Sequence, residues 1–310
     1  MEGLEQDTGS IFSQPWWLDV VAPGAWGEAR IEKGGILHAR MPYVMKKKWG
    51  LRILDMPSLT QTLGPWLRTY EGKYTNRLAE EKELMTELIR QLPPFDVFQQ
   101  NFHHSIENWL PFYWQGFQQT TRYTYVLEDL TNPDAIWDSM EKKIRTGIRK
   151  AEKQLTVRDD LSLDQFIGLN EMVFTRQRRQ SPYHRSVIER IDNACKSRDC
   201  RRIFFAHDES ERVHAAVYII WDEQSAYYLM SGSDPDLRES DANSLCLWKA
   251  IKFSSSVTQA FDFEGSMLKN VEPFFRAFGG KQKPYFQIRK INSRLVGATF
   301  DLWMRFRDTP

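Results

Sequence analysis

The sequence has few cysteines, no metal-ligand pattern and almost no net charge. Its 310 residues include only three cysteines, and the formal net charge is +1. Three cysteines are too few for a disulfide framework, and no cysteine pair or histidine cluster has the spacing of metal ligands. We therefore expect reduced cysteines and no metal site. The small net charge excludes the strong basic field that drives non-specific nucleic-acid binding.

Long hydrophobic runs and a leader pattern are also missing. No run approaches the roughly 18 apolar residues that span a bilayer, and residues 1–10 are polar and acidic, without an apolar segment. We expect a cytoplasmic protein without a membrane span, beginning with a disordered tail over 1–10.

Aromatic residues are abundant, with 11 Trp, 11 Tyr and 19 Phe. A hydrophobic fraction of 41% and a charged fraction of 27% are typical of a globular protein. At this length we expect two domains, each with its own core, and most aromatic side chains filling those cores.

One short phrase occurs twice along the chain. Phe95-Asp96 matches Phe261-Asp262, and residues 111–113 (Pro-Phe-Tyr) match residues 273–275 (Pro-Phe-Phe) at nearly the same separation. A long offset with few gaps indicates two related units in one polypeptide. Two such units commonly form a ligand-binding cleft.

The hydrophobic periodicity predicts the same order of elements in both halves: three antiparallel strands, a helix, a strand, a helix and a strand. In the first half these fall at 29–32, 36–45, 51–54, 78–92, 95–99, 106–116 and 122–128. The second half begins with helices at 163–178 and 184–196, and continues at 201–206, 213–221, 226–232, 242–254, 260–264, 271–278 and 285–290, with a last strand at 300–307. The fold class is α+β, with helices flanking mixed, mostly antiparallel sheets.

A basic amphipathic helix from 132 to 154 separates the halves. We predict domains at 11–130 and 156–310, with 131–155 as a bridging helix. Six cations lie on the polar side of this helix: Lys142, Lys143, Arg145, Arg149, Lys150 and Lys153.

Residues 227–235, 242–251 and 261–280 resemble the FemAB-like branch of the GNAT acyltransferases. The resemblance implies two tandem GNAT-like subdomains and an N-acyltransferase that moves an acyl or aminoacyl group from an activated donor to an amine. A cell-wall precursor such as a peptidoglycan building block, or an amino sugar, is the implied acceptor. The donor stays open between acyl-CoA, aminoacyl-tRNA and an acyl carrier protein. No permanently bound cofactor is implied, and tRNA is a candidate partner.

The resemblance places the donor site at Gly232, Arg238, Asn243 and Ser244. A GNAT loop normally carries two glycines before the helix whose N-terminus holds the pyrophosphate. Residues 238–243 (Arg-Glu-Ser-Asp-Ala-Asn) keep the arginine and lack both glycines. Phe275 also stands where many GNAT enzymes carry a general-acid tyrosine, and the matching Tyr113 is interpreted as a core aromatic. These departures support an alternative, a catalytically silent FemAB-like binding module.

Asp262 and Glu264 are the catalytic candidates. They alternate with phenylalanines, so we expect both carboxylates on one face of a strand, where they would orient or deprotonate the attacking amine. The structural alternative is that they cap the next helix or pair with Arg276.

The acceptor-side candidates are Arg145, Arg149, Tyr228, Ser266 and Lys48. Arg145 and Arg149 carry the pattern of the resemblance and are suited to bind phosphates. The alternative is a solvated helix face with pairs such as Glu141 with Arg145. Ser266 has a second interpretation as a residue that shapes its turn, and Lys48 as part of a solvated hairpin tip.

Overall fold

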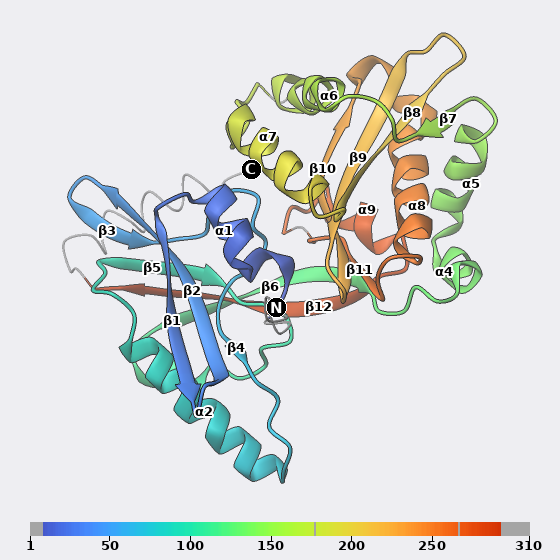
Figure 1. The fold of residues 1–310 in the computed structure, drawn as a ribbon. Helices are drawn as coiled ribbons and strands as arrows, with labels where there is room; N and C mark the ends of the chain where they lie inside the picture. The colour runs from blue at the N-terminus through green and yellow to red at the C-terminus, as the bar shows by residue number, and fades with distance from the viewer. Residues whose placement is uncertain (1–8, 177, 266, 293–310) are drawn as a thin grey trace. The chain divides into compact units, whose positions relative to one another are not determined.

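The computed structural model describes residues 9–176, 178–265 and 267–292. The described chain forms two compact units (Figure 1). Unit 1 comprises residues up to Arg122 and those from Pro284 onward, and unit 2 comprises Tyr123–Lys283. The predicted tail falls outside the described residues except for residues 9 and 10, and the strand predicted at 300–307 falls outside them entirely.

The sheet of unit 1 begins with the predicted antiparallel meander. Its strands are β1 (Trp26–Lys33), β2 (Ile36–Lys48) and β3 (Leu51–Leu54), and the short β4 (Trp66–Leu67) also pairs with β2. β5 (Val97–Asn101) runs parallel to β3. β12 (Lys281–Ile291) then pairs with β5 in antiparallel fashion through its unit 1 residues.

Four helical segments lie in the described part of unit 1, and one of them, α2, packs on β1 and β2. They are η1 (Ile11–Ser13), α1 (Pro15–Val21), α2 (Tyr74–Arg90) and α3 (Leu110–Trp114). α2 buries Leu84, Met85, Leu88 and Ile89, as its helical periodicity predicts. These side chains join the core of unit 1 with Phe98, Phe102 and Phe112.

The sheet of unit 2 is antiparallel except for one strand pair. β7 (Thr156–Arg158), β8 (Arg201–His207), β9 (Val213–Trp221) and β10 (Ser225–Ser233) follow one another as antiparallel neighbours. β11 (Ala260–Asp262) runs parallel to β10, and on its other edge it pairs with the last residues of β6 (Gln118–Leu127). The three-residue β7 was not predicted because it is too short to show alternation.

Helices flank the unit 2 sheet from opposite sides (Figure 1). α6 (Leu163–Arg176) packs on β10 and is followed by α7 (Arg185–Lys196). η2 (Pro235–Ser240) leads into α8 (Ala242–Ser254), which packs on β8 and β9. α8 is apolar on nearly every side because α5 (Lys142–Ala151) covers its outer face.

The segment predicted as one bridging helix is two helices inside unit 2. α4 (Pro133–Ser139) and α5 are separated by Met140 and Glu141, whose backbones are extended. Asn132 caps α4 by accepting a hydrogen bond from the Ala135 amide at 3.1 Å. The Glu141 amide donates to the Ala277 carbonyl at 2.9 Å, a contact from distant sequence that periodicity does not reveal.

The repeated phrase marks equivalent elements in the two halves of the chain. α3 and α9 (Glu272–Arg276) each have five residues with a proline in the first turn, and each precedes a long strand, β6 or β12. The unit boundaries cut through β6 and β12, so each strand belongs to both units. These unit boundaries differ from the predicted domain boundaries, because the prediction assumed that each domain is one contiguous stretch of sequence.

The α+β class with helices flanking mixed, mostly antiparallel sheets is confirmed. Tyr113 is not the core aromatic that we expected: it lies on the outer side of α3 and is 59% exposed. Among the helices of the described residues, none combines the length and apolar character that a bilayer span requires.

Candidate functional site

The candidate site lies in unit 2, where two neighbouring parallel strands part. β10 and β11 pair from Ser225↔Ala260 to Tyr227↔Asp262. β11 ends there, while β10 continues to Ser233 with an irregularity in its pairing to β9 between Tyr228 and Met230. Beyond Tyr227, the backbone of β10 therefore no longer pairs with β11, and we call this place the split. The residues that follow Asp262 lie beside it.

Asp262 is a buried carboxylic acid at the end of β11, with 4% of its surface exposed. Its Oδ1 accepts hydrogen bonds from the Thr124 hydroxyl and, at 2.7 Å, from the Glu264 amide. Burial raises the pKa of Asp262 to about 6, although both hydrogen bonds favour the ionised form. The group therefore changes charge close to neutral pH.

Glu264 follows in a tight turn rather than on the strand. Its φ is +56°, in the left-handed region, and the next residue, Gly265, has φ +59°. A Cβ on Gly265 would overlap the Tyr123 carbonyl oxygen, so this turn packs directly on the backbone of β6. Burial, and then the charge of Asp262, raise the pKa of Glu264 well above its usual range.

The predicted pair of acids is therefore brought together, but by a turn instead of one strand face. In the described part of the chain, neither carboxylate makes the expected pair with Arg276 or a side-chain cap of α9. Arg276 binds Glu272 at 3.2 Å and Glu141 at 3.1 Å, and α9 has no side-chain cap. Glu272 also accepts a hydrogen bond from the Tyr125 hydroxyl. Glu272, and not Asp262 or Glu264, therefore helps to fix the position of α9.

Tyr228 and Asn243 meet on the β10 side of the split. Burial raises the pKa of Tyr228 to about 12, although the nearby side chains of Ser231 and Asn243 favour its ionised form. Its ring contacts Phe275 edge-on at 5.5 Å. The Asn243 Oδ1 is buried and accepts no hydrogen bond within the described part of the chain. The donor candidate Asn243 and the acceptor candidate Tyr228 thus lie near each other.

Gly232 allows α6 to pack closely on β10. A Cβ there would lie 2.6 Å from the backbone nitrogen of Asn170, so α6 approaches β10 at this point. Asn170 is 3% exposed and donates from Nδ2 to the Ser231 carbonyl at 2.6 Å, while Tyr183 donates to its Oδ1 at 3.2 Å. Sequence reasoning missed Asn170 and Tyr183. The sequence feature that could have identified Asn170 is its position as a polar residue on the apolar face of a predicted helix.

The loop before α8 contains a left-handed backbone conformation of the kind that glycine usually adopts, but here the residue is Asp241. Asp241 is the N-cap of α8 and has φ +56°, a conformation that aspartate tolerates better than most residues. Its carboxyl carbon lies 2.9 Å from where a Cβ on Gly147 would stand, so the carboxylate packs against α5. Arg238 is exposed on η2, and Ser244 is buried in the first turn of α8.

The two arginines of the basic helix have different surroundings. Arg145 pairs with Asp138 at 3.5 Å, and its Nε is buried and makes no hydrogen bond to any described residue. The Arg149 guanidinium lies 5.3 Å from the Trp137 ring centre on the exposed face of α5. Glu141, the expected partner of Arg145, binds Arg276 instead.

The remaining acceptor candidates are Lys48 and Ser266. Lys48 ends β2 in unit 1, where its ammonium lies 4.5 Å from the Trp49 ring centre. Ser266 lies outside the described residues, so its predicted contact stays a prediction.

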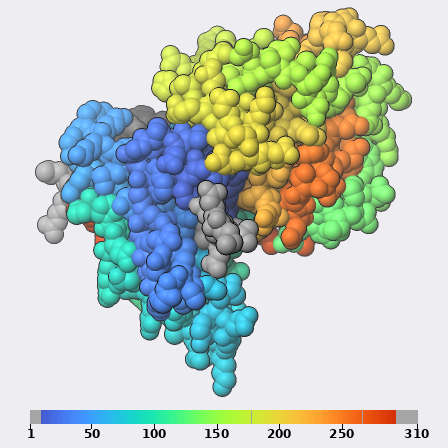
Figure 2. Space-filling model, viewed as in Figure 1, coloured from blue at the N-terminus to red at the C-terminus, as the bar shows by residue number. Residues whose placement is uncertain are grey.

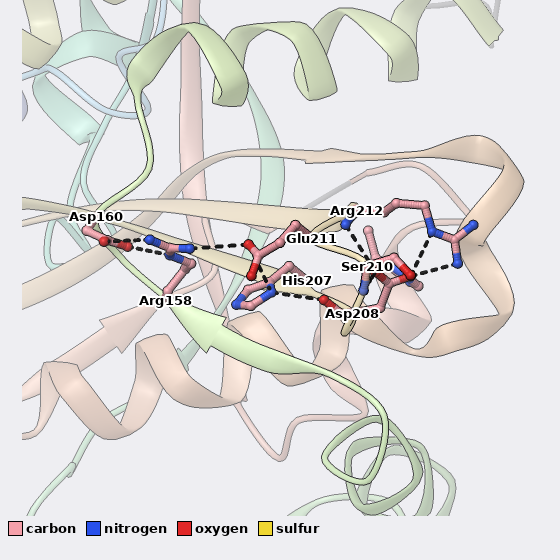
Figure 3. Close-up of polar contacts among 8 residues, drawn as sticks. Arg158, Asp160, His207, Asp208, Ser210, Glu211 and Arg212 are labelled. Carbon is pink, nitrogen blue, oxygen red and sulfur yellow. Dashed lines mark hydrogen bonds and ion pairs between the residues drawn. The ribbon is translucent and has the colours of Figure 1, made fainter.

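A separate group of ion pairs orders the β8–β9 hairpin (Figure 3). Arg158 binds Asp160 and Glu211, and Asp208 binds Arg212 at 2.7 Å. His214, with Arg212, lowers the pKa of Asp208. Most of these side chains are exposed and already paired, so their role is to hold the hairpin. Within the described ranges, no group of His, Cys, Asp or Glu has the geometry to hold a metal ion.

Comparison with known proteins identifies the domain that contains the split. Residues 138–266 match the family model of the acetyltransferase (GNAT) domain. The crystal structure of FemX superimposes with a TM-score of 0.65 at 13% identity, covering 90% of this chain and 92% of that one. No curated protein has a sequence that matches this chain significantly.

Two further solved structures have a similar fold. The C-terminal domain of a putative lysylphosphatidylglycerol synthetase from Agrobacterium fabrum has a TM-score of 0.51 at 12% identity, covering 89% of this chain and 88% of that one. A tandem GNAT protein from the clavulanic acid biosynthesis pathway has a TM-score of 0.50 at 11% identity, with 88% and 85% covered. The predicted resemblance is confirmed to this extent: residues 138–266 match a GNAT domain, and the fold of the chain is similar to that of FemX.

Proposed function

We propose that this protein is an N-acyltransferase that moves an acyl or aminoacyl group to the amine of a cell-wall or sugar-type acceptor. The observation that carries the proposal is the pair of neighbouring carboxyl groups, Asp262 and Glu264, at the point where β10 and β11 part, both with raised pKa values. Carboxyl groups with raised pKa values are suited to proton transfer near neutral pH.

The reaction is a direct transfer without a covalent enzyme intermediate. The acceptor amine attacks the carbonyl carbon of the donor and forms the new C–N bond. The bond from that carbon to the donor's sulfur or oxygen breaks, and its electron pair leaves with the donor. The attacking nitrogen must also lose one proton, and this step requires a base.

Glu264 is the base in this proposal. Its raised pKa makes its carboxylate a stronger base than an ordinary glutamate, and its half-buried side chain is closer to solvent than that of Asp262. Asp262 acts as a positioning residue because its Oδ1 holds the Glu264 amide. The negative charge of Asp262 also favours the protonated product state of Glu264.

The donor is proposed to bind at the first turn of α8. Backbone amides at a helix N-terminus favour anions such as a pyrophosphate or a phosphodiester. Arg238 adds an exposed cation, and the buried Oδ1 of Asn243 can accept a hydrogen bond from an N–H or O–H group of the donor. Both acyl-CoA and aminoacyl-tRNA carry such phosphates, and Arg145 with Arg149 would contact phosphates of the acceptor or of tRNA. Gly232, Ser244, Tyr228, Ser266 and Lys48 remain proposed contacts.

A transfer assay tests this proposal. Purified protein is incubated with labelled acyl-CoA or with a charged tRNA pool, together with amine acceptors that include amino sugars and cell-wall peptides. We expect transfer of label to an amine, and a strong loss of transfer in Glu264→Gln. Thermal shifts with each donor at low salt then separate thioester binding from tRNA binding.

The alternative function is a silent binding module. The two missing glycines of the 238–243 loop and Phe275 in place of tyrosine favour it. Donor-dependent stabilisation without any transfer to the acceptor panel would support the binding module and overturn the proposed enzyme.

A further inference from the structure

Unit 1 contains an open groove between an edge strand and two helices. It lies against β1, α2 and α3, and its cavity has a volume of about 470 Å³. Figure 2 shows the start of α2, in cyan, standing out on the surface of unit 1. Its lining includes Lys33, Lys82, Glu83, Glu87, Arg90 and Trp114. Its volume is within the roughly 300–1,000 Å³ of small-molecule sites.

An exposed indole forms one wall of this groove. Trp114 is 60% exposed although it is the largest apolar side chain of α3. The other side of the same helix packs Pro111 and Phe112 into the core, so the helix turns Leu110, Tyr113 and Trp114 outward. An exposed tryptophan that lines a cavity offers a flat apolar face to a ligand.

The charges around the indole are mixed and nearly balanced. Lys33 pairs with Glu80 at 2.9 Å, and Arg90 pairs with Glu87 at 3.4 Å. The Lys82 ammonium lies 5.7 Å from the Trp114 ring centre, and Glu83 adds a carboxylate to the lining. A phosphate or nucleotide would meet these carboxylates, so the groove does not favour a polyanion.

We propose that this groove binds an uncharged saccharide, with one pyranose ring stacked on Trp114. A sugar ring has an apolar C–H face that suits an indole, and hydroxyl groups on its edge that both donate and accept hydrogen bonds. Lys82 and Arg90 supply donors, while Glu83 and Glu87 supply acceptors. The residues involved belong to unit 1, and the inference does not depend on the transferase chemistry proposed for unit 2.

Saturation-transfer NMR and calorimetry with neutral oligosaccharides test the inference. The probes are chitotriose, cellotriose and maltotriose, added to the full chain. We expect at least one of them to bind, with saturation transfer strongest at the ring protons of one sugar face. Trp114→Ala should weaken that binding about tenfold or more, and Glu87→Gln should weaken it several-fold.

Trp49→Ala provides the matched control, because Trp49 is 80% exposed in the same unit and does not line the groove. Its binding should equal that of the unaltered protein. Absence of binding by all three sugars would overturn the inference, as would binding that Trp114→Ala leaves unchanged. Binding that weakens steeply with added salt would also overturn it, because that dependence indicates an ionic ligand. Neither result bears on acyl transfer, which is measured separately.

Discussion

Two aspartates in the same repeated phrase have opposite electrostatic environments. Asp96 in unit 1 receives hydrogen bonds from the backbone amide and side chain of Arg52, which lower its pKa. Asp262 in unit 2 is buried beside Thr124, and its pKa is raised to about 6. The repeated phrase therefore does not preserve the chemistry. Asp96 lies just before β5, whereas Asp262 ends β11 at the point where β10 and β11 part.

The short helices α3 and α9, which follow the two copies of the phrase, also differ in burial. Phe275 of α9 is 6% exposed and packs against Tyr228, whereas Tyr113 at the matching place in α3 is 59% exposed. The α9 copy packs beside the candidate active site, whereas the α3 copy presents aromatic side chains at the surface. Four experiments test how far this division of roles extends.

Glu264→Gln should have the largest effect. We expect a loss of transfer rate on the order of 10²–10⁴-fold, because the amide cannot accept the proton of the attacking amine. The unaltered protein should lose activity on acidification with an apparent pKa above that of an ordinary glutamate, in accord with the raised pKa of Glu264. Steady-state kinetics across pH provide the measurement. Asp96→Asn is the matched control and should retain the full rate, and an equal loss in both variants would contradict the assignment.

Phe275→Ala should destabilise the protein far more than Tyr113→Ala. Truncating a buried phenylalanine typically costs about 3–5 kcal/mol, while a change at an exposed position stays within about 0.5 kcal/mol. Chemical denaturation monitored by circular dichroism measures both values. Similar free energies of unfolding for the two variants would remove the distinction between the copies.

Gly265→Ala should cost more than Gly116→Ala. Both glycines have positive φ, +59° and +78°, so each alanine introduces backbone strain of about 1 kcal/mol. Gly116 has open space around it, whereas a Cβ on Gly265 overlaps the backbone of β6. We therefore expect a total cost of roughly 3 kcal/mol at Gly265. Thermal unfolding of the two variants is the check, and equal melting temperatures would rule out the close approach.

Asp262→Asn should change how stability depends on pH, in the direction opposite to Asp96→Asn. The raised folded pKa of Asp262 means that its stabilising contribution is complete below pH 4 and is lost as pH rises through 6. Relative to Asp262→Asn, the unaltered protein should lose up to roughly 3 kcal/mol between pH 4 and 7. Denaturant titrations at several pH values measure this difference.

The lowered pKa of Asp96 has the opposite consequence. Its contribution is present above the unfolded pKa and is lost as pH falls through the folded pKa. Asp96→Asn should therefore matter more at neutral pH than at low pH. Parallel pH profiles for the two asparagine variants would show that the aspartates share one environment, contrary to the structure.

The sequence by itself determined the order of elements and the presence of two related copies. Periodicity located α2, α6 and α8 and the β8–β10 meander to within a few residues, because the apolar spacing of a segment is contained in that segment. The phrase around residues 261–280 also identified Asp262 and Glu264 as the acids of interest. These conclusions need only neighbouring residues.

The tertiary structure decided what those residues experience. Burial in the core raises the pKa of Asp262 to about 6, although Thr124 of β6 donates a hydrogen bond that favours its ionised form. The contact between Asn170 and Ser231 likewise joins segments far apart in the chain. The break at Met140 and the exposure of Tyr113 have the same origin. Burial, charge coupling and the ends of elements depend on which distant residues pack together, and local periodicity carries no information about those partners.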